Sequence, residues 1–413
     1  MIAEIKKNLT CPPELEKMYR HNKADFKKAF NDIYPTIKDH VSAQVWHERL
    51  NFEKQEITWG NKNELIITIA LAIAAGLCAN LPLIAGLDTA SFYQRNISFL
   101  FLPMLILYFS WKSQIESKHI VTISILMLLS IIYINVLPAK EHSDTLVLAC
   151  IHLPLFIWGI LGISFIGKDY MQPAKRIEFL KYNGDLVVIT TVLLIAGGLL
   201  TAISVGLFEL INIRFENYIQ YIAPAGAASM PIVGSYLISK NPYLVKSVSP
   251  VISKVFTPMV LIMLLIYLAA IVYTGKDPYN DRQFLLIFNI LLIGVMALIL
   301  FSITEASKNI SNLSTIWLLF SLSLVTILLN GIAFTAILFR ISEWGITANR
   351  LAVLGGNILM LTNLIAIAFR LFRSLKDQQY LVSVNQSIGS FLPIYWFWTI
   401  IVVFLFPMIF AFN

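Results

Sequence analysis

The sequence contains few charged residues: Lys, Arg, Asp and Glu make up 13% of its 413 residues, whereas hydrophobic residues make up 57%. A soluble globular protein carries about 25% charged residues, so the polar surface of this chain is too small to face water on all sides. Long uncharged runs recur after Leu65. Most of them reach the roughly 20 apolar residues that cross a hydrocarbon core of about 30 Å. The composition excludes a soluble protein and predicts an integral membrane protein.

The sequence also lacks the motifs of several enzyme classes. It has no P-loop, no GxGxxG turn and no GxSxG nucleophile elbow. The 3 cysteines are scattered, so they do not indicate a disulfide framework, and no Cys/His spacing is typical of zinc. No h-region precedes Leu65, so we expect no cleavable signal peptide. We therefore expect no cofactor, and the sequence identifies no catalytic residue or metal ligand.

Residues 64–413 are predicted to form an all-α polytopic transmembrane helical bundle of about eleven spans. The second span is short, and Arg95 beside it is expected to extend its guanidinium to the interface. As bounded here, no span contains Asp, Glu, Lys or Arg, which argues against a carboxylate-driven pump. The predicted spans are Leu65–Gly86, Ile97–Trp111, His119–Pro138, Thr145–Ile166, Leu186–Phe208, Ile219–Ser239, Val255–Thr274, Gln283–Ile303, Ser314–Phe339, Leu351–Phe369 and Phe391–Phe412.

Lysine and arginine in the loops predict the orientation. Loops on the side of the N-terminal segment hold almost twice as many of these residues as the opposite loops, and the segment itself adds more. By the positive-inside rule, the N-terminus is expected in the cytoplasm and the C-terminus in the periplasm. If the short second span did not cross, the later spans would invert. The net charge of +7 follows this loop pattern, so it does not indicate a nucleic-acid partner.

Residues 1–63 are polar and are predicted to form a short soluble segment of amphipathic helices on the cytoplasmic side. Pro12 and Pro13 suit the first turn of a helix, and Pro35 is expected to interrupt the pattern. Two functions are open: a cap on the membrane domain, or a docking module for a cytoplasmic partner. Apolar residues recur at three- and four-residue spacing at Leu15, Met18, Tyr19, Phe26, Phe30, Ile33, Ile37, Val41 and Val45, with Trp46 and Leu50 alongside.

The stretch Gln172–Tyr182 offers a second amphipathic pattern. Lys175, Arg176 and Lys181 are predicted to reach anionic lipid head groups from it. A solvated loop is an equally good interpretation of the same residues.

Polar residues inside the spans give a candidate substrate path. Ser323, Thr326 and Asn330 share one face of the ninth span, and Gly356 and Asn363 share one face of the tenth. Proline interrupts the first and sixth spans, and broken helices in two halves are typical of transporters with inverted repeats. The alternative for all of these residues is close helix packing. The other path residues are Pro224 and Pro231 in the sixth span and His152 in the fourth.

The outward loops carry a second candidate site. Carboxylates there are suited to a divalent cation, and paired arginines are suited to a lipid phosphate. Local ion pairs at solvated loop ends explain the same residues. The residues are Asp277, Asp281, Arg282, Arg340, Glu343 and Arg350.

Two of these loops, Tyr273 to Arg282 and Arg340 to Leu351, together with Trp59-Gly60-Asn61-Lys62, resemble an uncharacterised bacterial multi-pass membrane family. The family is a domain of unknown function with the serial number forty-one fifty-three. The resemblance runs from about the first span to the end of the chain. It implies a bacterial inner-membrane protein, and it assigns no catalytic or ligand residue.

Three functions remain open from the sequence. The first is a permease-like carrier of a neutral or lipid-like substrate, which requires a polar cavity beside Ser323, Thr326 and Asn330. The second is a non-enzymatic envelope scaffold or sensor that depends on residues 1–63. The third is a lipid-modifying enzyme at the outer head-group level, where carboxylates would have to lie close together.

Overall fold

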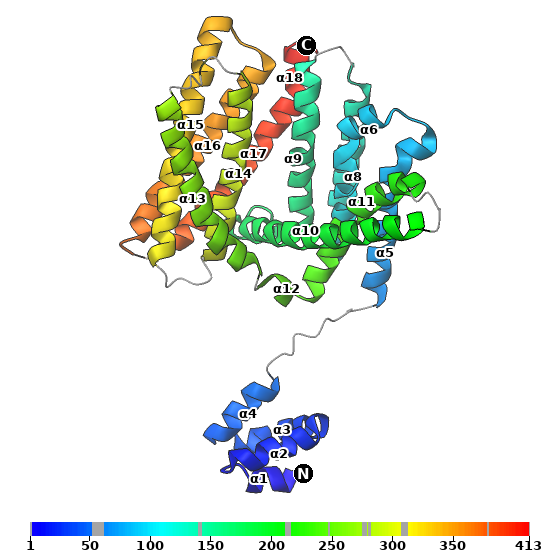
Figure 1. Cartoon of the computed structure of the whole chain (residues 1–413), viewed down its shortest axis with the longest axis vertical. Coiled ribbons are helices and arrows are strands. Elements are labelled where there is room, and N and C mark those ends of the chain that lie inside the picture. The colour runs from blue at the N-terminus through cyan, green and yellow to red at the C-terminus, as the bar shows by residue number, and fades with distance from the viewer. Residues whose placement is uncertain are drawn as a thin grey trace. The chain divides into compact units, whose positions relative to one another are not determined.

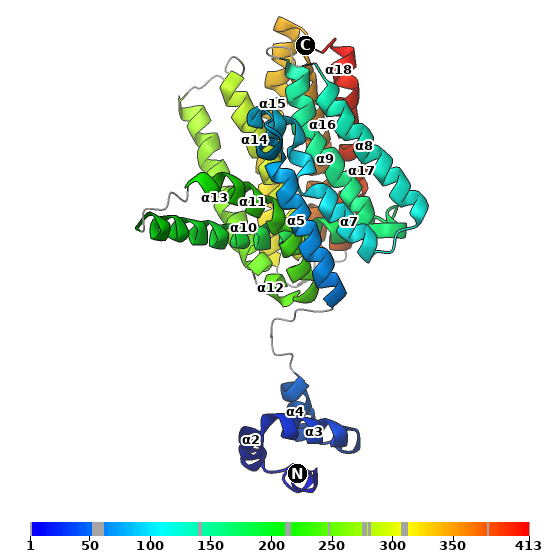
Figure 2. The same ribbon diagram turned by 90° about the vertical axis from the view of Figure 1, so that its right-hand side faces the viewer.

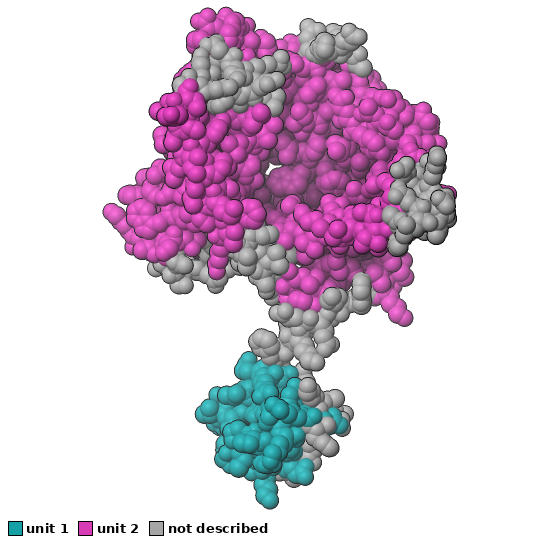
Figure 3. Space-filling model, viewed as in Figure 1, with its two compact units in different colours: residues 1–58 teal, residues 59–413 magenta. Residues whose placement is uncertain are grey.

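The computed structural model describes residues 2–51, 62–138, 143–210, 216–246, 248–274, 279, 282–306, 313–377 and 380–412. Within these residues every regular element is a helix, which confirms the predicted all-α class. The chain forms two compact units, residues 1–58 and residues 59–413 (Figure 3). The division between them falls just before the described helix that begins at Lys62.

The first unit packs around aromatic side chains. It contains α1 (Ile2–Lys7), α2 (Pro12–His21), α3 (Lys23–Ile37) and α4 (Val41–Asn51). Pro12 and Pro13 occupy the first turn of α2, as predicted. The rings of Tyr19, Phe26 and Trp46 lie 5.3–5.8 Å apart in the centre of the unit. The unit therefore has a hydrophobic core of its own.

Two local predictions for this unit are wrong. Helix α3 continues through Pro35 and ends only at Ile37, so the proline lies in the last turn and does not separate two helices. Val41 and Val45 are 75% and 61% exposed, because α4 turns its opposite face inward. Trp46 on that face fills the space between the rings of α2 and α3, and it buries more apolar area than a valine does.

The second unit consists of long apolar helices, ten of which, among the described residues, have the length and composition of a membrane span. This supports a multi-pass membrane protein. These ten are α5 (Lys62–Ala85), α8 (Ser117–Val136), α9 (Asp144–Ile166), α10 (Pro173–Leu210), α11 (Glu216–Lys240), α13 (Val248–Thr274), α14 (Arg282–Ala306), α15 (Leu313–Trp344), α16 (Ala348–Ser374) and α17 (Tyr380–Ile400). Shorter pieces are α6 (Thr89–Asn96), η1 (Ile97–Phe99), α7 (Leu102–Lys112), η2 (Gly167–Asp169), α12 (Tyr243–Lys246), the π-helical η3 (Ile401–Leu405) and α18 (Phe406–Ile409).

The short second span is a broken helix. Its α7 has 11 residues and covers only about 16 Å at 1.5 Å per residue. The pieces α6, η1 and α7 together nevertheless run the length of their neighbours. Arg95 in α6 contacts the end of α8 at Leu137, whereas Lys112 at the end of α7 contacts Glu64 at the start of α5. Three short pieces in sequence therefore make the passage for which a single helix was expected.

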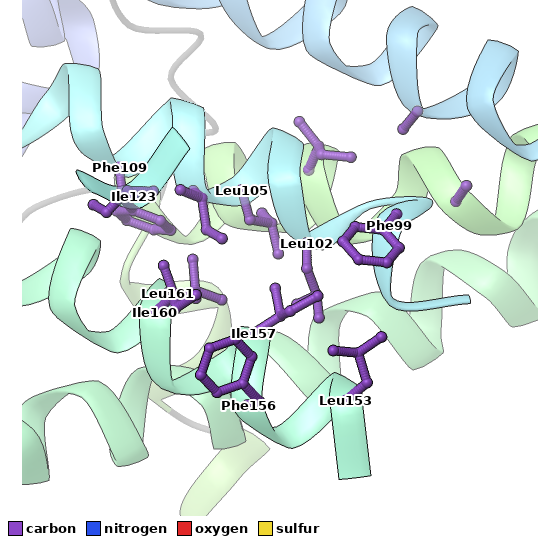
Figure 4. Close-up of a cluster of buried hydrophobic side chains, with 14 of the residues drawn as sticks. Phe99, Leu102, Leu105, Phe109, Ile123, Leu153, Phe156, Ile157, Ile160 and Leu161 are labelled. Atoms are coloured by element: carbon purple, nitrogen blue, oxygen red, sulfur yellow. The ribbon is translucent and has the colours of Figure 1, made fainter. Parts of the chain in front are cut away.

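The helices of the second unit form two lobes. In the first lobe, buried side chains of α5, α7, α8, α9 and α11 form one cluster, and Figure 4 shows Leu102 and Leu105 of α7 close to Leu153 and Ile157 of α9. In the second lobe, α13 to α16 enclose a separate cluster. Helix α17 joins the lobes, because Ile388 in its first half packs in the second cluster and residues further along it pack against the first.

Helix α10 lies across the bundle, and Figures 1 and 2 both show it roughly at right angles to α9. The sequence predicted a loop or amphipathic stretch at Gln172–Tyr182 and a separate span at Leu186–Phe208. Both segments belong to one helix of 38 residues, so the loop interpretation and the separation of the two segments are wrong. Gly184 does not break the helix, and its missing side chain leaves room for the ring of Phe301. The first half of α10 contacts both lobes, because Phe179 lies in the first cluster and Leu180 packs against the second.

Helices α5 and α11 pack against each other in antiparallel orientation along their length. Ser229 donates to the carbonyl of Ala72, and Asn80 donates to the carbonyl of Tyr221. Gly76 allows this close approach, because a Cβ there would lie 3.2 Å from the Cβ of Ala225. Both helices remain continuous despite their prolines. The predicted interruptions are thus absent from the described parts of these two helices.

Candidate functional site: an apolar groove beside helix α17

An apolar groove runs between α8, α9 and the second half of α17, with a volume of about 820 Å³. Small-molecule sites have volumes of about 300–1,000 Å³. Leu129, Ile132 and Val136 on its α8 wall are 51–75% exposed, so the groove opens toward the outside of the bundle. Figure 2 shows α8 inclined beside α17 on this side of the unit. The groove is lined by Leu126, Leu129, Ser130, Ile132, Tyr133, Val136, Leu137, Pro138, Phe156, Trp396, Ile400, Phe404 and Phe412.

The end of α8 is held by Arg95. Its guanidinium donates to the carbonyl oxygens of Ile134 at 2.6 Å and Leu137 at 2.9 Å, and Arg95 is only 8% exposed. The guanidinium therefore ends at the last carbonyls of α8, and its expected position at the interface stays a prediction. The last carbonyls of a helix have no partner within the helix and carry partial negative charge, so a buried cation is stabilised there. Asn96 and Asn135 add a reciprocal pair of amide hydrogen bonds at 3.0 and 2.8 Å.

A hydrogen bond crosses the groove from α8 to the π-helical segment η3. The hydroxyl of Tyr133 donates to the carbonyl oxygen of Phe404 at 3.3 Å, and the two rings lie 5.1 Å apart. A π-helical turn shifts the backbone hydrogen bonds of its helix, and such turns are frequent at functional sites. Here the wider turn lies directly at the wall of the groove.

The floor of the groove is a stacked aromatic pair. The rings of Phe156 and Trp396 are 5.8 Å apart and nearly parallel, and the indole N–H donates to the carbonyl of Phe156 at 2.9 Å. Gly159 makes this arrangement possible, because a Cβ at that position would lie 2.1 Å from the Trp396 ring. The shape of the floor therefore depends on one glycine in α9.

The predicted substrate path lies elsewhere, in the second lobe. Ser323, Thr326, Asn330 and Asn363 are all fully buried between α15 and α16. The hydroxyls of Ser323 and Thr326 donate to carbonyl oxygens one turn earlier in their own helix, at 2.8 and 2.7 Å. These residues share a buried face, and none of them lines the groove.

The remaining path residues have local roles. His152 contacts the carbonyl of Leu148 in its own helix at 2.9 Å, which fits a packing residue. Pro224 and Pro231 lie inside the continuous helix α11. At Gly356 a Cβ would meet no atom within 4 Å, so this position has free space around it.

Only part of the predicted outer-face site lies within the described residues. Asp277 and Asp281 are outside them, as is the side chain of Arg282. The guanidiniums of Arg340 and Arg350 lie 5.0 and 5.7 Å from the ring of Trp344.

Arg350 also closes the end of α15. It donates to the carbonyls of Trp344 and Gly345 at 2.7 and 2.6 Å. Glu343 is exposed. This arrangement satisfies the end of a helix, and the predicted outer-face site stays a prediction because its two aspartates lie outside the described residues.

The three cations predicted to contact anionic lipid are not equivalent. Arg176 donates to the backbone carbonyls of Tyr170, Met171 and Gly389 at 2.9–3.1 Å, so it braces α10 against α17. Lys175 pairs with Glu178 at 3.0 Å. The lipid contact of Lys175 and Lys181 stays a prediction.

A buried ion cluster was missed by the sequence analysis. The carboxylate of Glu64 at the start of α5 accepts from the hydroxyl of Tyr108 at 2.8 Å and from Lys112 at 3.3 Å. It also forms an ion pair with Lys240 at the end of α11. These residues stand at the edges of predicted spans, where a charge is usually taken to face water. Each of them lies at the end of a helix, and these ends lie together because neighbouring helices run in opposite directions. The alternating direction of successive spans could have indicated this cluster.

The described residues contain no group of three or more His, Cys, Asp or Glu side chains that is suited to a metal ion. No family model, curated protein or solved structure matches this chain. The resemblance to the uncharacterised bacterial family therefore stays a prediction.

Proposed function

We propose that this protein is a membrane carrier that takes up a lipid-like molecule from the bilayer through the apolar groove between α8 and α17, and not through the polar cavity expected beside Ser323, Thr326 and Asn330. The observation that carries the proposal is the groove itself: it has a volume of about 820 Å³ and an almost wholly apolar lining. Ser130 is the one serine in the lining. Its hydroxyl donates to the carbonyl of Leu126, so it offers no free donor to a ligand. A site of this kind favours hydrocarbon over a polar solute.

The length of the groove supports an acyl chain as the bound part. Its α8 wall extends from Leu126 to Val136, which corresponds to about 15 Å at 1.5 Å per residue, and Leu137 and Pro138 extend it beyond the helix. Half of a hydrocarbon core of about 30 Å is about 15 Å. The groove is therefore long enough for the chain of a lipid from one leaflet.

The cellular setting is part of the same proposal. We place the protein in a bacterial inner membrane, with the N-terminus in the cytoplasm and the C-terminus in the periplasm. The loop charge pattern and the family resemblance support this placement. The passage made by α6, η1 and α7 supports the predicted number of crossings before α8.

Photo-crosslinking with a clickable diazirine phospholipid tests the proposal. The protein is reconstituted in nanodiscs with this lipid, and crosslinked peptides are mapped by mass spectrometry. We compare Leu129→Trp, which fills the groove, with Leu128→Trp on the same helix. Leu128 is 59% exposed and Leu129 57%, but only Leu129 lines the groove. We expect Leu129→Trp to remove crosslinks at Phe404 and to leave those at lipid-facing residues unchanged.

Transport is measured separately, as the rate at which a fluorescent lipid becomes accessible to a quencher on the other side of a proteoliposome. Leu129→Trp should slow this rate, and Leu128→Trp should not. Equal crosslinking in the two variants would refute the groove as a lipid site. Lipid binding with no protein-dependent transport would refute the carrier and leave a lipid-binding scaffold.

A further inference from the structure

A second polar feature lies inside the second lobe, on helices that do not line the groove. Asn330, Asn357 and Asn363 of α15 and α16 are at most 1% exposed. Both amide atoms of Asn330 and of Asn357, and the Oδ1 of Asn363, have no hydrogen-bond partner among the described residues. The neighbouring hydroxyls of Ser323 and Thr326 are satisfied by their own helix. Asn289 and Asn385 of the same lobe each have an Oδ1 without a partner among the described residues, but only Asn330 and Asn357 lack a partner at both amide atoms.

The hairpin geometry brings two of these asparagines to one level. Helices α15 and α16 follow each other, separated by residues 345–347, and lie side by side in Figures 1 and 2. Asn330 lies fourteen residues before the end of α15, and Asn363 lies fifteen residues after the start of α16. At 1.5 Å per residue both are about 21–23 Å from the connection, and Asn357 is about 9 Å closer to it than Asn363 is.

Helix α17 closes the third side. The Nδ2 of Asn363 donates to the hydroxyl of Tyr395 at 3.0 Å, and that hydroxyl donates to the carbonyl of Leu359 at 3.3 Å. The indole N–H of Trp398, one turn further along α17, also has no partner among the described residues. Polar groups from three helices therefore surround one region of the lobe.

Unpaired amides are costly inside a protein, because each gives up its hydrogen bonds to water and gains none in return. A leucine fills a similar volume without that cost. The amides are favourable only in a state in which a partner supplies both donors and acceptors. Residues 314–339 and 351–369 contain no Asp, Glu, Lys or Arg, so that partner carries no charge that needs neutralising.

We propose that Asn330, Asn357 and Asn363 form a binding site for a small neutral molecule that bears hydroxyl or amide groups. The structure, in which these three asparagines are buried, is the closed form of this site. It opens when α15 and α16 move apart, which exposes the amides. The site is on helices distinct from the groove walls at α8 and α9, so it does not depend on a lipid in the groove.

Cysteine accessibility tests the opening. In a background in which Cys11, Cys78 and Cys150 are replaced by serine, Asn330→Cys is compared with Leu329→Cys, because both native side chains are fully buried on the same helix. The probe is the small neutral reagent methyl methanethiosulfonate, applied to the protein in proteoliposomes. We expect Asn330→Cys to react at least about tenfold faster, which is the ratio produced by a difference of about 1.4 kcal/mol in opening free energy. Equal rates would overturn the proposal.

A second measurement distinguishes a binding site from asparagines that stay buried without a partner in every state. Adding Asn330→Leu to Asn363→Cys should slow the labelling of the cysteine, because the open form loses a group that pairs with solvent or ligand. If the asparagines have no partner in any state, Asn330→Leu should instead raise the melting temperature and leave the labelling rate unchanged. That result would also overturn the proposal. Labelling by a cationic methanethiosulfonate as fast as by the neutral reagent would refute the neutral ligand class.

Discussion

Replacing Glu64 by glutamine tests whether the buried ion cluster holds α5, α7 and α11 together. Glu64 is 7% exposed, and its carboxylate contacts Tyr108, Lys112 and Lys240. Glutamine has the same shape but no charge. In the variant, the two lysine side chains lose the carboxylate that they share, while the hydroxyl of Tyr108 keeps an acceptor.

The expected magnitude follows from burial. Removing one partner of a buried ion pair costs about 3–5 kcal/mol, because the other charge stays in a poorly solvating environment. The side chains of Lys112 and Lys240 are 35% and 21% exposed, so water compensates part of the loss and we expect about 3 kcal/mol. Glu116 is the matched control, since its partner lysines are 73% exposed. Glu116→Gln should cost about 0–1 kcal/mol.

The free energy of unfolding is measured by equilibrium titration of detergent-solubilised protein with sodium dodecyl sulfate. The double variant Glu64→Gln with Lys240→Gln removes both partners of one pair and should regain part of the stability that the single variant loses. If Glu64→Gln costs no more than Glu116→Gln, the cluster does not hold the helices. If the double variant loses the sum of the two single losses, the two side chains are not coupled.

Three further predictions follow from local geometry. Gly159→Ala should destabilise the protein by about 1–3 kcal/mol, because its Cβ would lie 2.1 Å from the indole below the groove, whereas Gly294→Ala, with no atom within 4 Å, should be neutral or stabilising in the same titration. Tyr133→Phe should speed lipid exchange in the groove, measured by the rate of crosslink formation, because it removes the hydrogen bond between α8 and η3. An unchanged or slower rate would show that this hydrogen bond does not limit lipid exchange. In the first unit, the hydrogen bond from Arg20 holds the pKa of Glu16 below its usual value of 4.5. The stabilisation from this hydrogen bond is fully present above the usual pKa and is lost as the pH falls through the lowered pKa. The hydrogen-exchange protection of α2 should therefore decrease in acid, and it should decrease less in Glu16→Gln.

The lipid-facing character of the chain could be predicted from composition, and so could the approximate positions of most helices. A long segment without charge prefers the bilayer whichever helices pack beside it, because the bilayer acts as the solvent of that segment. The buried face of α15 was also predictable, since Ser323, Thr326 and Asn330 are polar residues in an apolar helix and avoid lipid. The positions of these three residues therefore followed from local sequence.

Contacts between distant segments were decided only by the tertiary structure. Helices such as α8 and α9 are apolar on all sides, so their sequence does not indicate which face is buried and which borders a groove. Nothing near Glu64 in the sequence indicates that Lys240 will meet it, because that contact depends on the antiparallel packing of α5 and α11. The sequence alone specified which segments prefer lipid, whereas packing between segments far apart in the chain determined the groove, the ion cluster and the course of α10.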